Sequence, residues 1–242
     1  MINNYPIVNI YEKKALKSKL SSQLIYGEKF KILSKKNGWL KIKTSYDKYT
    51  GFIKKRKFIK NMKVTHKISS LFANIYSKPK NKFILNFKLP FCSLISVTEK
   101  TKNFYKFQNY WIKKKDVLPV NYKRQTFKNI KIFKNIPYKW GGKTYKGIDC
   151  SALIQMHYKV NNKFYPRDTI DQIKVKVGKI NKLKFKSGNL IYWKGHVAVC
   201  INSKYLIHAY GPKKKVLIMP INKTIELIKS TADLKIKKIF SI

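Results

Sequence analysis

The chain has 242 residues, 44% of them hydrophobic and 14% aromatic, so it is long enough to bury a core and to form more than one domain. It carries 55 Lys and Arg residues against 10 Asp and Glu, a formal net charge of +45. Only three of the basic residues are arginines, and the lysines are spread along the whole chain. Because recognition of phosphates and bases relies on the planar fork of arginine, we attribute the charge mainly to composition and expect no specific nucleic-acid partner.

Targeting, membrane and metal signals are missing from the sequence. The N-terminus lacks the basic start and apolar stretch of a signal peptide, and no run of about 18 apolar residues is present that would span a membrane. The three cysteines, Cys92, Cys150 and Cys200, are too widely spaced for a disulfide framework or a zinc site. These observations predict a reduced, cytoplasmic protein without a metal or a cofactor. The oligomeric state is left open.

The first 120 residues predict an all-β region. Asn37-Gly38 is a hairpin signal between two alternating runs. The first set of strand-like runs covers residues 5–11, 20–33, 37–43 and 49–55, and the second covers residues 68–77, 83–91, 93–100 and 104–117. Residues 118–123 are interpreted as a linker. The predicted domains are therefore residues 1–60, 61–120 and 121–242.

Cys150 is the candidate nucleophile. It follows a glycine-rich loop and begins a segment in which apolar residues recur at helical spacing. A sulfur at the N-terminus of a helix meets unpaired N–H groups and the helix dipole, which favour the thiolate over the thiol. The thiolate is the nucleophilic form, so the position suits attack on a carbonyl carbon. A buried, inert cysteine is the alternative interpretation of this segment alone.

Two of the four histidines are candidates for a general base and its partner. His157 lies seven residues after Cys150 on the same predicted helix, about 10 Å along its axis, which is too far for direct proton transfer. His66 belongs to the all-β region. His196 begins an alternating strand-like run, and His208 lies in the next one, separated by a short turn. Antiparallel pairing would bring the two imidazoles side by side, one as base and one as the group that orients it.

The motifs around these residues resemble those of known families. In family order they read PYKWGG, GIDCSA, PRDTIDQ, GNLIYW, GHVAVCI and IHA, between about residues 125 and 220. They resemble the NlpC group of papain-like cysteine peptidases, while SSQLIYGE, GW and DKYTGFI near the N-terminus resemble a bacterial SH3-like barrel. The resemblance implies an α+β papain-like catalytic domain preceded by all-β SH3-like barrel domains, the second of them degenerate. By the same resemblance, Cys150 is the nucleophile, His196 the base and His208 the orienting residue.

The resemblance also implies a substrate. Enzymes of this type cut the bond between the γ-carboxyl of D-glutamate and a diamino acid in peptidoglycan stem peptides. In members that recycle free peptides, the barrel restricts the substrate to peptides with a free N-terminus. On this basis Tyr49, Trp140, Asp149 and Ser151 are candidate substrate-binding residues, with the last two holding the terminal ammonium. The chain departs from the family pattern at Lys19, Ala152 and Asn189.

Other functions remain open at this level. An amidase or acyltransferase on the same fold would keep Cys150, His196 and His208 and change the groove. A non-catalytic wall-binding protein would keep the fold but commonly loses one of the three. A nucleic-acid-binding protein would gather arginines and aromatic residues on one face, which the even spread of lysines argues against.

Overall fold

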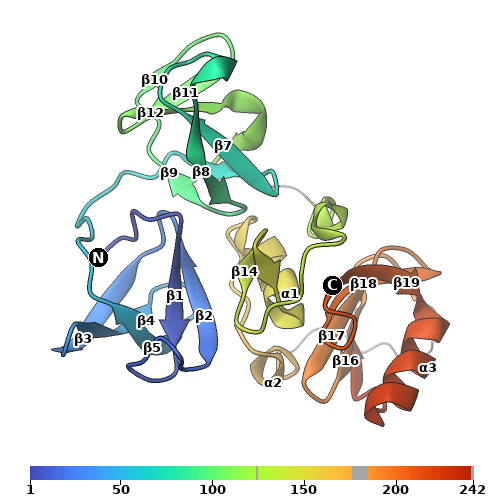
Figure 1. Ribbon diagram of the computed structural model, residues 1–242. Coiled ribbons are helices and arrows are strands. Elements are labelled where there is room, and N and C mark those ends of the chain that lie inside the picture. Colours follow the sequence, from blue (N-terminus) through green and yellow to red (C-terminus); the bar gives the residue numbers. More distant parts are fainter. Residues whose placement is uncertain (124, 176–184, 241–242) are drawn as a thin grey trace. The chain divides into compact units, whose positions relative to one another are not determined.

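The computed structural model describes residues 1–123, 125–175 and 185–240 (Figure 1). The chain forms two compact units. The N-terminal unit consists of Met1–Lys123 together with Val160–Asn162, and the C-terminal unit consists of Arg124–Lys159 and Lys163–Ile242.

The N-terminal unit begins with an antiparallel sheet of order β2-β1-β5-β4-β3. Its strands are β1 (Ile7–Tyr11), β2 (Leu20–Ile25), β3 (Phe30–Lys36), β4 (Trp39–Thr44) and β5 (Thr50–Lys54). Asn37 and Gly38 join β3 to β4 with φ angles of 49° and 72°, the left-handed conformation of a two-residue hairpin turn, as the sequence predicted. Inward-facing side chains such as Ile10, Leu24 and Ile42 form the core of this sheet.

The run predicted over residues 20–33 is wrong as a single strand, because the chain turns at Gly27. The φ angle of Gly27 is +82°, which disfavours any residue with a side chain. The backbone N–H of Leu94 also donates to the carbonyl of Tyr26 at 2.9 Å, and a Cβ on Gly27 would lie 2.3 Å from the Leu94 oxygen. The turn therefore depends on a partner about 70 residues later in the chain, which local periodicity does not reveal.

The rest of this unit contains two further sheets, of order β10-β11-β12-β7-β8 and β13-β6-β9. The predicted run 104–117 is also divided, by a turn at Gln108, where φ is 49°. Both sheets pack around one apolar cluster, which also includes Tyr26 from the first barrel. The elements are β6 (His66–Ile68), β7 (Phe72–Tyr76), η1 (Asn81–Phe83), β8 (Ile84–Pro90), β9 (Leu94–Ile95), β10 (Glu99–Lys100), β11 (Phe104–Phe107), β12 (Tyr110–Lys113), η2 (Lys114–Asp116) and β13 (Val117–Pro119).

The predicted linker at residues 118–123 is partly structured. Leu118 and Pro119 pair with β6 as part of β13. The buried ammonium of Lys67 donates to the carbonyls of Val120 and Tyr122, at 2.8 and 2.6 Å. A buried charge is stable when it is well hydrogen-bonded, so Lys67 anchors this segment to the N-terminal unit.

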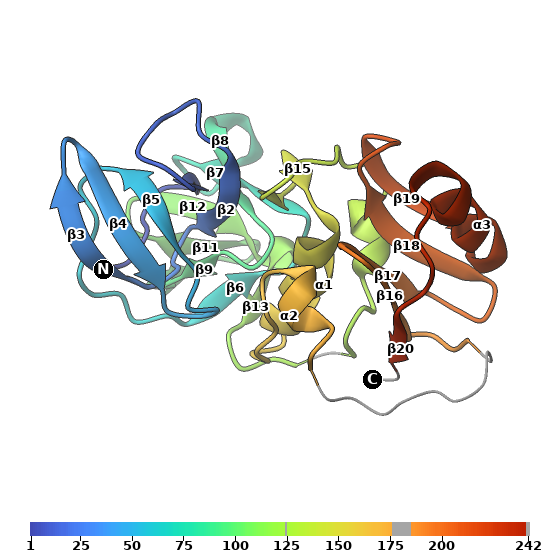
Figure 2. The ribbon, with the colours of Figure 1, turned by 90° about the horizontal axis from the view of Figure 1, so that it is seen from below.

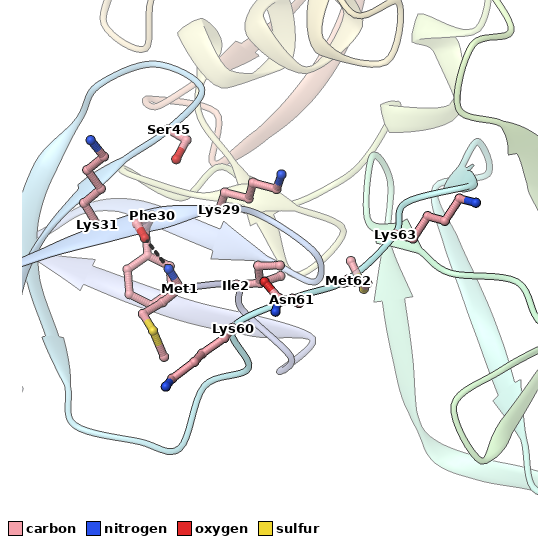
Figure 3. Close-up of a pocket in the computed structure, with 10 residues that line it drawn as sticks. All are labelled: Met1, Ile2, Lys29, Phe30, Lys31, Ser45, Lys60, Asn61, Met62 and Lys63. Carbon is pink, nitrogen blue, oxygen red and sulfur yellow. Dashed lines mark hydrogen bonds between the residues drawn. The ribbon is translucent and has the colours of Figure 1, made fainter.

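A cavity of about 470 Å³ lies in the first barrel (Figure 3). Its lining combines apolar side chains with four lysines: Met1, Ile2, Lys29, Phe30, Lys31, Ser45, Lys60, Asn61, Met62 and Lys63. The side chains of Lys31 and Lys60 point to opposite sides, so their ammonium groups do not converge on one ligand (Figure 3). None of the lining residues is a cysteine or a histidine, which separates this cavity from the candidate chemistry.

The C-terminal unit is built on an antiparallel sheet of order β19-β18-β17-β16-β20. The helices α1 and α3 lie on opposite sides of this sheet (Figure 2). Side chains of the sheet, including Trp193 and Leu206, pack with Ile221 and Ile228 of α3. The elements are η3 (Ile130–Phe133), β14 (Lys143–Thr144), β15 (Gly147–Ile148), α1 (Cys150–Lys159), α2 (Thr169–Gln172), β16 (Leu190–Trp193), β17 (His196–Cys200), β18 (Tyr205–Tyr210), β19 (Lys215–Pro220), α3 (Ile221–Ala232) and β20 (Lys238–Phe240).

Candidate active site

Cys150 is the first residue of α1, as the sequence predicted. Asp149 is the N-cap: its backbone carbonyl accepts the first helical hydrogen bond from Leu153, and its Oδ1 accepts the N–H of Ala152 at 2.8 Å. The Sγ of Cys150 lies 4.0 Å from the carbonyl oxygen of Gly195 and accepts the backbone N–H of Val197. The sulfur therefore lies next to the chain segment on both sides of His196.

The protonation state of the thiol differs from the sequence-based expectation. Cys150 is only 6% exposed, and burial raises the pKa of its thiol to about 12, with a further contribution from the neighbouring Asp149 carboxylate. The backbone N–H groups of Val197 and Ser151 and the charge of Arg167 lower this pKa, but by less. The predicted resting thiolate is therefore wrong for this structure, because desolvation outweighs the favourable helix terminus.

His196 and His208 lie side by side, as the pairing of two antiparallel strands predicted. β17 pairs with β18, and the Nε2 of His196 is 2.9 Å from the Nδ1 of His208. Aromatic rings surround the pair: Tyr210 stacks on His208 at 5.1 Å, and Trp193 lies 5.6 Å from His196. These contacts fix both imidazole planes.

Both imidazoles are neutral at ordinary pH. Burial lowers the pKa of His208 to about 4. Burial also lowers the pKa of His196 well below its usual value, and the neighbouring His208 adds to this effect. A neutral imidazole can accept a proton, so the pair has the protonation state that a general base requires.

The buried Nε2 of His208 restricts how the protons are arranged. It has no hydrogen-bond partner within the described part of the chain. A base at the Nδ1 of His196 requires that nitrogen to be unprotonated, so the proton of His196 is on Nε2 and points to the Nδ1 of His208. In that arrangement His208 carries its own proton on the buried Nε2.

The carboxylate of Asp149 is surrounded by donors. Within the described residues, it accepts hydrogen bonds from five groups: the N–H of Gly141, the N–H of Ala152, the hydroxyl of Ser151, and both Nη atoms of Arg167, at 2.6–3.1 Å. A carboxylate offers about four lone-pair sites, so these donors fill it. A substrate ammonium would have to replace one of them. The prediction that Asp149 and Ser151 hold the substrate's amino end stays a prediction.

Tyr138 is a residue of the site that the sequence analysis did not single out, although it belongs to the PYKWGG motif. Burial raises the pKa of its phenol, and the negative charges of Cys150 and Asp149 raise it further. The hydroxyl therefore remains protonated, and the backbone of Tyr138 bridges to that of Ile148, two residues before Cys150. Its backbone is held by a hydrogen bond of 2.8 Å to the carbonyl of Lys214.

Trp140 and Tyr49, the other candidate substrate-binding residues, are placed differently. Trp140 is 55% exposed and precedes Gly141, whose N–H binds Asp149 at 2.9 Å. Its indole is thus presented by a loop tied to the N-cap of α1. Tyr49 belongs to the N-terminal unit, where its backbone N–H donates to the hydroxyl of Thr44 at 2.8 Å. The substrate-binding roles of both residues stay predictions.

Across residues 1–123, 125–175 and 185–240, no group of three His, Cys, Asp or Glu side chains is arranged to hold a metal ion. In the same ranges, no helix is long and apolar enough to cross a membrane.

Comparisons with known proteins identify two domains in the chain. Residues 135–231 match the NlpC/P60 family, and residues 10–58 match the bacterial dipeptidyl-peptidase Sh3 domain. The chain is 24% identical over 233 residues to dipeptidyl-peptidase 6 of Lysinibacillus sphaericus, covering 84% of each chain. It is also 24% identical over 233 residues to the gamma-D-glutamyl-L-lysine dipeptidyl-peptidase of Bacillus subtilis, covering 85% of this chain and 77% of that protein.

The structural comparison extends across both units. An NlpC/P60 family protein from Bacillus cereus has a TM-score of 0.78 with this chain at 19% identity, and the likeness covers 91% of this chain and 94% of the other. At that identity the likeness speaks for the fold, which is α+β and papain-like in the C-terminal unit and all-β and SH3-like before it. The chain is therefore a cysteine peptidase, with an NlpC/P60 domain and an N-terminal bacterial dipeptidyl-peptidase SH3 domain.

Proposed function

We propose that the chain hydrolyses the γ-D-glutamyl–diamino acid bond of peptidoglycan stem peptides and acts on free peptides that begin with L-Ala. The observation that carries this proposal is the extent of the likeness to the gamma-D-glutamyl-L-lysine dipeptidyl-peptidases. It spans 85% of the chain and so includes the β-rich N-terminal unit as well as the peptidase domain.

The reaction begins with a neutral thiol and a neutral imidazole. The Nδ1 of His196 takes the thiol proton of Cys150 as the sulfur attacks the carbonyl carbon of the γ-glutamyl bond. His196 then gives this proton to the leaving amine, and an acyl-enzyme remains. A water molecule, deprotonated by His196, releases the acyl group and restores the thiol. His208 accepts the Nε2–H of His196 and stabilises the imidazolium that forms at each step.

The negative oxygen of the tetrahedral intermediate needs donors close to Cys150. One is the backbone N–H of Cys150, the first residue of α1. We assign the second to the hydroxyl of Tyr138, because the backbone of Tyr138 bridges to Ile148, two residues before Cys150, and its raised pKa keeps the phenol protonated. A phenol that stays protonated next to a negative charge is a suitable hydrogen-bond donor.

Two aromatic residues are proposed to bind the peptide. The exposed indole of Trp140 lies beside the N-cap of α1 and provides an apolar surface for the substrate backbone. Tyr49 lies in a turn that is held by hydrogen bonds among Thr44, Asp47 and its own N–H. These bonds fix the backbone that carries the Tyr49 side chain. We propose that this side chain limits the length of the peptide on its amino side.

The test uses the full chain with L-Ala-γ-D-Glu-L-Lys and the same peptide acetylated at its N-terminus. We expect release of L-Ala-γ-D-Glu and lysine from the free peptide, and turnover of the acetylated peptide at least about a hundredfold slower. Cys150→Ala serves as the inactive control. Equal turnover of the two peptides would refute selection for a free amino end, and cleavage of neither would refute the substrate assignment.

A further inference from the structure

The motif PRDTIDQ contains a buried cation for which the proposed reaction has no direct use. Arg167 is 3% exposed and makes a two-pronged ion pair with Asp149, with Nη2–Oδ2 and Nη1–Oδ1 distances of 2.6 and 3.0 Å. Its Nη1 also donates to the hydroxyl of Ser151 at 2.9 Å. Arg167 therefore binds the residues on both sides of Cys150.

Buried hydrogen bonds hold the loop that carries Arg167 in place. The side-chain amide of Gln172 donates to the carbonyls of Ser151 and Pro166, both at 2.9 Å. The amide of Gln155, on α1, donates to the carbonyl of Tyr165 at 3.2 Å. Hydrogen bonds thus join the loop to α1 both before and after Arg167. They hold the guanidinium in position.

The negative charge of Asp149 is a problem for the nucleophile. It lies one residue before Cys150, and a buried carboxylate near a sulfur opposes formation of a thiolate. The same carboxylate caps α1 through the N–H of Ala152, so the helix start depends on it. A matched cation removes this conflict, because it leaves the cap in place and cancels its charge.

We propose that Arg167 is a positioning residue for the nucleophile: it holds Asp149 as the N-cap of α1 and neutralises it, so that Cys150 can lose its proton during attack. The inference rests on the assignment of Cys150 as the nucleophile in the proposed function. It does not depend on which peptide is cleaved.

The other titratable groups around the thiol limit how a test is interpreted. The charge of Arg167 lowers the pKa of Cys150, whereas that of Asp149 raises it. Cys150 raises the pKa of both Tyr138 and Tyr192, and His196 follows Gly195, whose carbonyl lies 4.0 Å from Sγ. Each of the variants below leaves these three side chains unchanged.

The experiment follows alkylation of Cys150 by iodoacetamide, with the labelled site identified by peptide mass, from about pH 6 to 10. This readout needs no substrate. In Arg167→Met the carboxylate is no longer compensated, so we expect labelling about tenfold slower at each pH below the thiol pKa. In the double variant Asp149→Asn with Arg167→Met both charges are absent, and the rate returns to within about threefold of the unmodified chain.

Two further variants make the result decisive. Asp149→Asn alone keeps an oxygen that caps the helix and leaves the cation in place, so Cys150 should be alkylated about tenfold faster. Lys174→Met removes a cation from the exposed ion pair with Asp171 and is the matched control, with no expected change. If Arg167→Met does not fold, the comparison of Asp149→Asn with the double variant measures the same charge effect.

Three outcomes would overturn the proposal. The first is an unchanged alkylation rate in folded Arg167→Met. The second is a double variant that is as slow as Arg167→Met, which would show that Arg167 supports the loop only through packing. The third is an Asp149→Asn variant whose thiol reacts no faster than that of the unmodified chain.

Discussion

Two neighbouring parts of the C-terminal unit keep ionisable groups away from water in opposite ways. At the start of α1, Asp149 and Arg167 are both charged and are matched by hydrogen bonds from every side. On β17 and β18, His196 and His208 are joined by a hydrogen bond and are kept neutral by burial. The comparison shows that burial favours the neutral form of an ionisable group unless hydrogen-bond donors and an opposite charge compensate the charged form. Cys150, the proposed nucleophile, lies between the ion pair and the histidine pair.

The largest expected effect comes from removing the sulfur of Cys150. Cys150→Ala should lower hydrolysis by about a millionfold while leaving the Asp149–Arg167 pair and the histidine pair intact. Peptide cleavage followed by chromatography measures the loss. Cys200→Ala is the control, because Cys200 is a buried thiol in the core beneath α3, and its variant should remain active. An inactive but folded Cys200→Ala would mean that loss of activity does not identify the nucleophile.

A smaller loss of activity is expected from a substitution at Tyr138. Tyr138→Phe removes the proposed oxyanion donor and keeps the ring, so kcat should fall about 10²- to 10³-fold with little change in KM. The alkylation rate of Cys150 should stay nearly the same, since a neutral phenol contributes no charge. A kcat within about threefold of the unmodified chain would remove Tyr138 from the mechanism.

Lowering the pH tests the histidine pair, because burial lowers the pKa of both imidazoles. In the unfolded chain a histidine titrates near 6.5, whereas burial lowers the pKa of His208 to about 4 in the folded chain. The unfolded chain therefore takes up protons first, and the stability present above pH 6.5 is lost as the pH falls toward 4. His208 should account for about 3 kcal/mol of this loss by pH 4.

Urea unfolding between pH 7 and 4 measures this contribution. His208→Asn does not titrate in that range, so its stability should fall less steeply with pH than that of the unmodified chain. Parallel slopes for the two chains would mean that His208 is not held neutral. Activity provides a second reading: the acid limb of kcat/KM should lie well below pH 6.5, because the pKa of His196 is also lowered.

The smallest effect concerns the surface lysines. Raising the salt concentration from about 50 to 200 mM should change hydrolysis of a short peptide by less than about twofold, because the buried groups are weakly screened. Any binding to duplex DNA should weaken by several orders of magnitude over the same range. Tight, sequence-selective DNA binding at the higher salt concentration would show that the +45 charge has a specific nucleic-acid function.

Local pattern was sufficient to predict much of the fold and the elements that carry the chemistry. The helix that starts at Cys150, the strand that starts at His196 and the hairpin at Asn37-Gly38 all follow from spacing of apolar residues and turn chemistry. The proximity of His196 and His208 followed from the pairing of consecutive strands. Each of these features depends on residues close in sequence.

The features that sequence did not reveal depend on distant contacts. The pKa of Cys150 is set by how completely the folded chain buries it, which no local motif records. Arg167 lies 18 residues after Asp149, and nothing in PRDTIDQ says which carboxylate it meets. Tyr138 was part of a recognised motif, but its closeness to the sulfur appears only once β14 and β15 bring the loop back to α1.

The contact between Gly27 and Leu94 has a practical consequence for anyone who shortens this chain. Tyr26, next to Gly27, completes the apolar cluster of the sheets that follow, and its carbonyl accepts the N–H of Leu94. A fragment cut near residue 60 would expose that tyrosine and leave the partner core unfilled. Recombinant fragments of the β-rich part therefore have to extend through residue 123. If the first barrel were grafted onto another peptidase, a new partner would be needed for Tyr26 and Gly27.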